Sequence, residues 1–200
     1  MADPESGIVA ETDRLVLRRE APGDLAVWLE HMNTPEVMEK VGGVQSPEAV
    51  AEGFARMAAA AAEGLPSFYF LALKADGRLI GKGGLSLIET EVAPDELRGA
   101  VQVGWTLRAD CWGCGYAREA GEAALALAFA RLDLPRVYAQ TSQRNTASWG
   151  LMERLGMARR ADLDYPDTDY PPEDNPTMVY QLDATAWRAR VSAETSHADA

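Results

Sequence analysis

The sequence is short of several residue types, and each shortage excludes a class of protein. Only two cysteines, Cys111 and Cys114, occur in 200 residues, so a scaffold held together by several disulfides is excluded. The only histidines are His31 in an expected helix and His197 near the end of the chain, which argues against a histidine-based triad or metal site. No run of about 18 apolar residues occurs, so no membrane span is expected.

Positive charge is also scarce, because 19 lysines and arginines face 31 acidic residues and the net charge is −12. A nucleic-acid partner would need clustered basic residues and is not expected. The acidic balance suits a cationic small molecule or a basic peptide as partner, with solubility alone as the alternative explanation. The first residues have neither the basic flank nor the apolar core of a secretory signal, so we expect a cytoplasmic protein.

The apolar share of 47% and the charged share of 25% are typical of one soluble domain of ordinary size. We expect a flexible N-terminus over residues 1–10, a single domain over 11–183, and a C-terminal tail over 184–200 with a short helix around Trp187 followed by disorder. The expected strands span 15–19, 68–74, 78–88, 100–107, 137–141, 157–161 and 177–182, and the expected helices span 25–32, 35–40, 47–63, 116–132 and 146–155. Helices and strands that alternate in a mixed order with hairpins predict an α+β layer fold.

The most informative feature is the glycine-rich turn from Trp112 to Ala117, which follows an expected strand and opens directly into a helix rich in alanine and leucine. Gly113 and Gly115 lack Cβ, so the chain can bend sharply and a ligand can approach the backbone. The first N–H groups of a helix have no intrahelical partner, and with the helix dipole they favour an anion. The turn therefore predicts a site for a phosphate-bearing ligand, with an ordinary glycine-rich loop as the alternative.

Other phosphate-binding motifs and a thiol motif compete for the same turn. Arg118 stands where a dinucleotide fingerprint needs Gly or Ala, and no Gly-Lys-Ser/Thr follows as a Walker-type loop requires. Cys111 and Cys114 form C-W-G-C at the start of a helix, as in thiol redox proteins. A single C-x-x-C without a second ligand pair is a poor zinc site, so no metal is expected.

Further motifs accompany the turn in a fixed order. The run W-G-C-G-Y-A-R-E-A from Trp112 to Ala120 is followed by Asn145-Thr-Ala-Ser148 and then by the stop Leu155-Gly156-Met157. These motifs resemble the GNAT superfamily of acyl-CoA-dependent N-acetyltransferases, especially the branch typified by ribosomal-protein N-terminal (alanine) acetyltransferases. The segment E-T-D-R-L-V-L-R from Glu11 to Arg18 resembles the first strand of that family, and residues 35–38 resemble its first-helix turn.

The resemblance covers about residues 11–183 and implies the GNAT fold: a mixed, mostly antiparallel twisted sheet that is splayed in the middle and flanked by helices. It implies transfer of an acetyl group from acetyl-CoA to a primary amine, by direct attack in a ternary complex and without a metal. The acceptor would be a protein N-terminus or a small cationic amine, and the protein a monomer or homodimer. Two alternatives remain open, a non-catalytic acyl-CoA-binding or sensor domain and the C-x-x-C thiol redox protein.

The resemblance also implies roles for particular residues. The strand end from Trp105 to Leu107 would hydrogen-bond the pantetheine arm, and Trp105 or Thr106 would aim a backbone N–H at the thioester oxygen unless both are plain strand residues. Asn145 would bind the pantetheine arm or act as a helix N-cap, and Ser148 would assist the departing thiolate or bond locally. The expected acetyl-CoA-binding residues are Trp105, Thr106, Leu107, Trp112, Gly113, Cys114, Gly115, Tyr116, Ala117, Asn145 and Ser148, and the expected catalytic residues are Ser148, Asp164 and Trp105.

Two positions depart from the family pattern. Met152 stands where many members have a tyrosine that acts as an acid, and Gln102 stands where many have a glutamate that acts as a base. The attacking amine must still lose its proton, so the base is expected elsewhere. Asp164 and Glu89 are the candidates on flanking loops, with relay through bulk water as the alternative.

The segment 162–174 is distinctive because it reads DLDYPDTDYPPED, with six acids and no base. In the family, the loop between the last strands lines the acceptor side. We hypothesise that carboxylates such as Asp164 and Asp167 attract a cationic amine, while Tyr165 and Tyr170 pack on its apolar part. A solvated acidic loop is the alternative.

Overall fold

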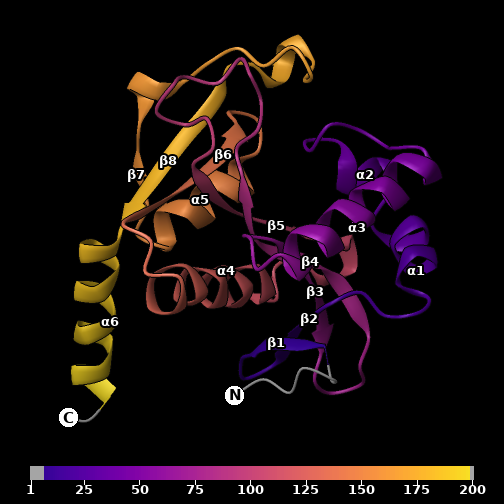
Figure 1. Cartoon of the computed structure of the whole chain (residues 1–200), viewed down its shortest axis with the longest axis horizontal. Helices are drawn as coiled ribbons and strands as arrows, with labels where there is room; N and C mark the ends of the chain where they lie inside the picture. Colours follow the sequence, from indigo (N-terminus) through magenta and orange to yellow (C-terminus); the bar gives the residue numbers. More distant parts are fainter. Residues whose placement is uncertain (1–6, 199–200) are drawn as a thin grey trace.

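A twisted eight-stranded sheet in the order β1-β2-β3-β4-β5-β6-β8-β7 organises the chain. The computed structural model describes residues 7–198, and Figure 1 shows the path of the chain. The strands are β1 (Ile8–Glu11), β2 (Leu15–Arg18), β3 (Phe68–Leu73), β4 (Leu79–Leu87), β5 (Val101–Leu107), β6 (Arg136–Ser142), β7 (Ala158–Arg159) and β8 (Thr177–Asp183). The α-helices are α1 (Asp24–His31), α2 (Pro35–Met38), α3 (Pro47–Ala62), α4 (Tyr116–Ala126), α5 (Thr146–Arg154) and α6 (Ala184–Ala198). Short 3-10 turns span Ala109–Cys111, Ala161–Leu163 and Pro172–Asp174, and a π-helical turn, Leu127–Arg131, continues α4.

Neighbouring strands are antiparallel throughout the sheet except for β5 and β6, which are parallel. The predicted α+β fold with a mixed, mostly antiparallel sheet is therefore confirmed. The Asp-Gly hairpin is also present, because Gly77 donates its N–H to the Leu73 carbonyl at 2.9 Å and its φ of +72° is in the left-handed region.

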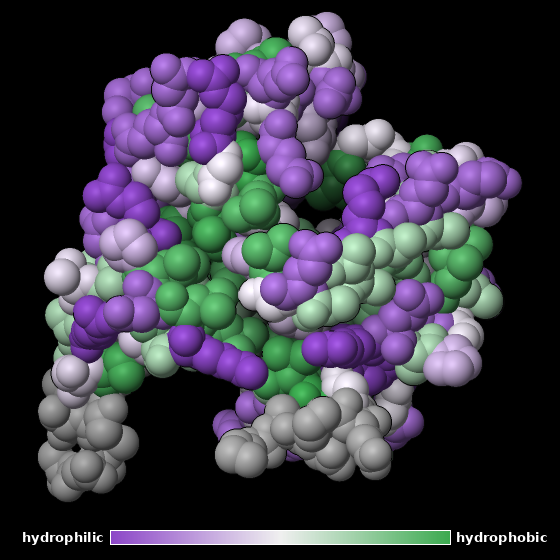
Figure 2. All heavy atoms as spheres, viewed as in Figure 1, coloured by the Kyte–Doolittle hydropathy of each residue, from purple (hydrophilic) through white to green (hydrophobic). Residues whose placement is uncertain are grey.

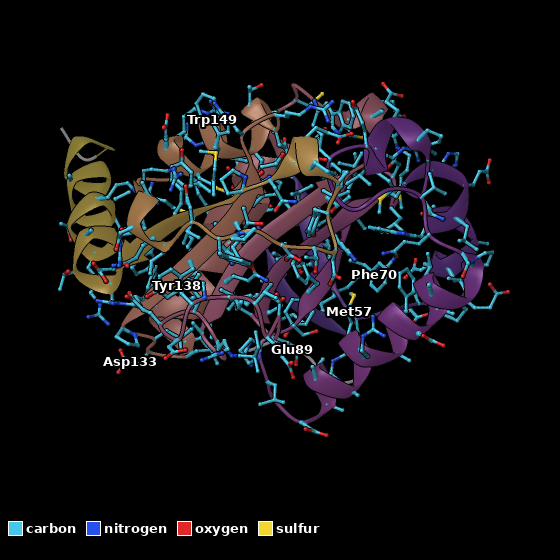
Figure 3. The ribbon with its side chains drawn as sticks, turned by 90° about the horizontal axis from the view of Figure 1, so that it is seen from above. Met57, Phe70, Glu89, Asp133, Tyr138 and Trp149 are labelled. Atoms are coloured by element: carbon cyan, nitrogen blue, oxygen red, sulfur yellow. The ribbon has the colours of Figure 1, made fainter. Side chains whose placement is uncertain are left out.

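Helices cover the two faces of the sheet differently. On one face, α4 packs against β2, β4 and β5, and α4 and α5 share a buried cluster with β5 and β6 that includes Val103, Phe129 and Leu155. On the other face, α1 and α3 enclose a second cluster around Trp28 and Phe70. Figure 3 shows Phe70 and Met57 on the α3 side, and Tyr138 and Trp149 in the other half of the molecule. The splayed middle of the sheet thus lies between two separately packed halves.

The N-terminal end differs from the expectation of a flexible segment. Residues Ile8–Glu11 form β1, which pairs antiparallel with β2, while residues 1–6 lie outside the described residues. Ala10 packs against the buried cluster that contains Leu15 and Leu17. Three apolar residues are too short a run to predict a strand, because the partner strand that stabilises it is not visible in the pattern.

The C-terminal end differs as well. The expected tail is the helix α6, which starts directly after β8 and continues to Ala198, so disorder after a short helix is wrong for the described residues; residues 199–200 lie outside them. The Trp187 ring packs 5.4 Å from the Phe129 ring, which ties α6 to the core. Among residues 7–198, no helix has the length and apolar character to cross a membrane.

Lys82 on β4 is an unusual feature of the second face. Its ammonium group lies 4.8 Å from the centre of the Trp28 ring and 5.7 Å from that of Phe68. Burial, together with the nearby positive charge of Arg56, lowers the pKa of Lys82 from 10.5 to about 8. The aromatic faces offset part of the desolvation cost of the charge, but the lowered pKa indicates that a cost remains.

We predict that Lys82→Met stabilises the protein at pH 7 by about 2 kcal/mol, because it removes a charge that is costly to bury. In the wild type, the unfolded chain binds more protons than the folded chain between pH 8 and 10.5, so wild-type stability rises with pH over that window. The advantage of the variant should therefore shrink over the same window. Urea unfolding at pH 7 and pH 10 gives the free energy of unfolding of the wild type and of the variant at each pH. Equal stabilisation by the substitution at the two pH values would contradict the prediction.

Candidate active site

The sheet opens between β5 and β6. These parallel strands are paired at a single position, Gln102 with Tyr138, whereas β5 is paired with β4 along its whole length from Val101 to Leu107. Beyond Gln102, the two strands separate toward their carboxyl ends, which leaves the backbone of β5 free to pair with a ligand on that side. The predicted splay of the sheet is confirmed, and it lies at the parallel pair.

A cavity of about 1080 Å³ occupies this opening. Its wall includes the ends of β5 and β6, the glycine-rich turn and the start of α5. It also includes the loop after α2 and part of the acidic segment. Figure 2 shows a hollow between the upper part of the molecule and the side that carries α2 and α3. Of the residues expected to bind acetyl-CoA, all except Cys114 line this cavity.

The glycine-rich turn is shaped by two residues in the left-handed region. Gly113 has φ +73° and Gly115 has φ +81°, conformations that residues with a Cβ rarely adopt. The Trp112 indole N–H donates to the Leu107 carbonyl at 2.9 Å, which ties the turn to the end of β5. Helix α4 then begins at Tyr116, and the first helical bond runs from the Glu119 N–H to the Gly115 carbonyl.

This geometry suits a pyrophosphate. The N–H groups that precede the first helical bond face no intrahelical carbonyl, and Gly113, Gly115 and Ala117 all line the cavity. A Cβ placed on Gly113 would meet no other atom within 4 Å, so there is open space beside the backbone. Backbone donors, the positive end of α4 and open space are what an anionic group needs.

Asn145 and Ser148 reach the cavity from α5. Asn145 is the N-cap of this helix, and its side-chain oxygen accepts the Ser148 N–H at 3.3 Å, so the expected capping role is confirmed. Both residues line the cavity, as does the buried Met152 one turn further on. The thioether of Met152 cannot donate a proton, which leaves Ser148 as the hydroxyl that α5 contributes to the cavity wall.

Asp164 does not reach the cavity. Both of its carboxylate oxygens accept hydrogen bonds from the Arg159 guanidinium, and the Val179 N–H donates to one of them at 3.2 Å. The residue is absent from the cavity wall, whereas Glu89 lies in that wall and is exposed. The geometry counts against Asp164 as the base, because its carboxylate joins Arg159 on β7 to Val179 on β8.

Two further residues, Gln140 and Tyr165, contact each other in the cavity wall. Gln140 on β6 donates from its side-chain amide to the Tyr165 hydroxyl at 2.9 Å, and both line the cavity. Burial raises the pKa of Tyr165 to about 12, so the phenol keeps its proton at neutral pH. Tyr165 was expected to contact the acceptor, but Gln140 carries no motif, and only the pairing of β6 with β8 brings it here.

Carboxylates outnumber cationic side chains in the cavity wall, where the cations are Lys40, Arg118 and Arg154. The carboxylates in its wall are Glu36, Glu39, Glu89, Asp167, Asp169 and Asp174. Asp174 is almost fully buried and accepts a hydrogen bond from the Ser142 hydroxyl at 3.1 Å. Arg144 lies between the two acidic segments, 3.5 Å from Glu39 and 3.7 Å from Asp174. The loop after α2 was not expected in the site, because no local pattern signals that it lies opposite the acidic segment.

The two cysteines are free thiols. Cys111 is buried, and burial together with the neighbouring Asp110 raises the pKa of its thiol. A redox-active cysteine needs a lowered pKa and access to solvent, and only Cys114 is exposed. The geometry therefore counts against a thiol redox site.

Comparison with known proteins agrees with this geometry. Residues 14–158 match the family model described as acetyltransferase (GNAT) domain. The chain belongs to the GNAT acetyltransferases and is an acyltransferase, which confirms the family resemblance and sets aside the non-enzymatic and redox alternatives. It is 26% identical over 154 residues to the uncharacterized N-acetyltransferase p20 of Bacillus licheniformis, across 76% of this chain and 83% of the relative.

Solved structures share the fold. An acetyltransferase from Agrobacterium tumefaciens str. C58 aligns with a TM-score of 0.69 at 26% identity, over 86% of this chain and 92% of that one. The spermidine N-acetyltransferase of Vibrio cholerae, solved with CoA and spermine, aligns with a TM-score of 0.69 at 16% identity, over 88% and 99% of the two chains. At 16% identity, the second likeness establishes the fold alone.

We predict that iodoacetamide modifies Cys114 at least about tenfold faster than Cys111 in the folded protein, because Cys111 is buried and its pKa is raised. Peptide mapping by mass spectrometry measures both rates. In Cys114→Ser, labelling should require denaturant. Comparable labelling of the two thiols in the native wild type would contradict the burial of Cys111.

Proposed function

We propose that this acyltransferase moves an acetyl group from acetyl-CoA to a primary amine on a cationic acceptor. The observation that carries the proposal is the polarity of one cavity. Its wall combines backbone donors at the start of α4 with carboxylates from α2, from Glu39 directly after it, and from the acidic segment. An anionic donor and a cationic acceptor would then meet where β5 and β6 separate.

In this proposal, the turn from Gly113 to Ala117 holds the pyrophosphate of acetyl-CoA through backbone N–H groups. The free edge of β5 from Trp105 to Leu107 pairs with the pantetheine arm, and Asn145 bonds the same arm. The thioester supplies an activated acyl carbon. A backbone N–H at Trp105 or Thr106 would stabilise the negative charge that develops on its oxygen, an effect worth about 3 kcal/mol.

Proton transfer is assigned to residues in the cavity wall. Glu89 is exposed at the wall and is the proposed acceptor of the amine proton, directly or through water. In Figure 3, Glu89 lies between Tyr138 and Met57. Ser148 is the proposed donor of a hydrogen bond to the departing sulfur, since Met152 cannot fill that role.

The proposal is tested first by calorimetry with CoA and acetyl-CoA. Gly113→Glu should weaken binding by about a hundredfold or more, because it strains a left-handed residue and places a carboxylate in the open space beside the turn where the pyrophosphate binds. Gly64→Glu is the matched control. Gly64 has a similar φ of +73°, a Cβ added to it would meet no other atom within 4 Å, and it lies outside the cavity wall. Absence of binding in the wild type would overturn the proposed donor.

A second prediction concerns the acceptor. Asp167→Asn combined with Asp169→Asn should raise KM for a cationic amine such as a polyamine by about five- to tenfold, with little change in KM for acetyl-CoA, because both residues line the acidic part of the cavity. Asp162→Asn, in the same segment but bound to Arg160 outside the cavity wall, is the control. If KM in the double variant is unchanged for every cationic amine that is turned over, the acidic segment has no role in acceptor binding.

A further inference from the structure

The turn between β1 and β2 reaches the start of α4, although the two are more than a hundred residues apart in sequence. Arg14 donates its backbone N–H to Glu119 Oε1 at 2.8 Å and its Nε to Glu119 Oε2 at 2.7 Å, with Nη2 at 2.6 Å from the same oxygen. The Thr12 hydroxyl also donates to Glu119 Oε1. The carboxylate of Glu119 is therefore enclosed by donors from a single short turn.

The same arginine continues to the glycine-rich turn. Arg14 Nη1 donates to the Cys114 carbonyl at 3.0 Å, and the guanidinium carbon lies 4.6 Å from the centre of the Tyr116 ring. One side chain thus contacts Cys114, Tyr116 and Glu119. We call this set of contacts the Arg14 clamp. Arg14 itself is not part of the cavity wall.

The clamp has an electrostatic consequence. Glu119 lies in the first turn of α4, where it would repel an anion bound at the helix N-terminus. Partial burial raises the pKa of Glu119, but hydrogen bonds from Thr12 and Arg14 outweigh this effect and hold the pKa below its ordinary value. The residue is therefore ionised at neutral pH, and Arg14 compensates its charge.

The clamp also orients a peptide group. In a trans peptide, the carbonyl of one residue and the N–H of the next point to opposite sides. Because the Cys114 carbonyl is bonded to Arg14, the Gly115 N–H points away from Arg14. Gly115 lines the cavity and Arg14 does not, so the fixed carbonyl directs this N–H toward the cavity side.

We propose that Arg14 is a positioning residue for acetyl-CoA, which compensates Glu119 and fixes the Cys114–Gly115 peptide so that the turn is ready to receive the pyrophosphate. This inference rests on the proposed function. It gives a role to the T-D-R-L segment, residues 12–15, which does not line the cavity.

The test compares Kd for acetyl-CoA with Kd for acetyl-pantetheine, which lacks the nucleotide and its pyrophosphate. Arg14→Gln should weaken acetyl-CoA binding by about tenfold and leave acetyl-pantetheine binding unchanged, because the clamp acts only at the pyrophosphate end. Adding Glu119→Gln to Arg14→Gln should restore part of the loss, since it removes the uncompensated charge. Arg18→Gln is the control: it breaks an ion pair of the same 2.6 Å length, to Asp24, at the other end of β2.

Amide hydrogen exchange over residues 112–119, without ligand, provides a second readout. Arg14→Gln should speed exchange in this segment by about tenfold relative to the rest of the chain, and Arg18→Gln should not. Arg14→Lys keeps the charge but cannot make the forked contacts, so its Kd for acetyl-CoA and its exchange rate should lie between those of the wild type and of Arg14→Gln. It replaces Arg14→Gln in both measurements if that variant does not fold. If Arg14→Gln loses affinity for acetyl-CoA and acetyl-pantetheine equally, or binds acetyl-CoA as the wild type does, the proposed role of Arg14 is overturned and the proposed function is not. No binding of acetyl-CoA by the wild type would overturn the proposed function as well.

Discussion

The site depends on one constraint in the sheet: β5 and β6 are paired at a single position. Each strand is held on its other side by a continuous antiparallel ladder, β5 by β4 and β6 by β8. The opening is therefore a gap between two firmly paired halves rather than a loose region of one sheet. The elements that follow the two strands, the glycine-rich turn with α4 and the capped start of α5, are consequently placed at the two sides of the same gap.

Two kinds of polar group line the gap. The α4 side offers backbone donors, with the carboxylate of Glu119 compensated by Arg14. The same wall contains carboxylates from two segments that are distant in sequence, with Arg144 between Glu39 and Asp174. In a chain with a net charge of −12, the carboxylate nearest the start of α4 in sequence is thus paired with an arginine.

Local signals were enough to predict much of the fold and one side of the site. The left-handed glycines, the Asn145 cap and the Asp-Gly hairpin each depend on residues within a few positions of one another, so a single sequence contains them. The general base was harder to predict, because the Asp164 carboxylate is available only if Arg159 and the Val179 N–H on β8 do not bind it. The contribution of the loop after α2, the contact between Gln140 and Tyr165, and the docking of α6 depend on tertiary packing that no local pattern encodes.

The cavity wall joins residues 36–45 from the N-terminal part of the chain to residues 165–177 near the end of the sheet. Such distant contacts form late in folding, since a long loop must close before they can compensate its lost entropy. On the ribosome, β1 to α4 can pack against one another while β6 to β8 are still being made. The cavity wall is therefore completed only when β8 has paired with β6, and a nascent chain that already contains the glycine-rich turn still lacks the part of the wall that residues 165–177 supply.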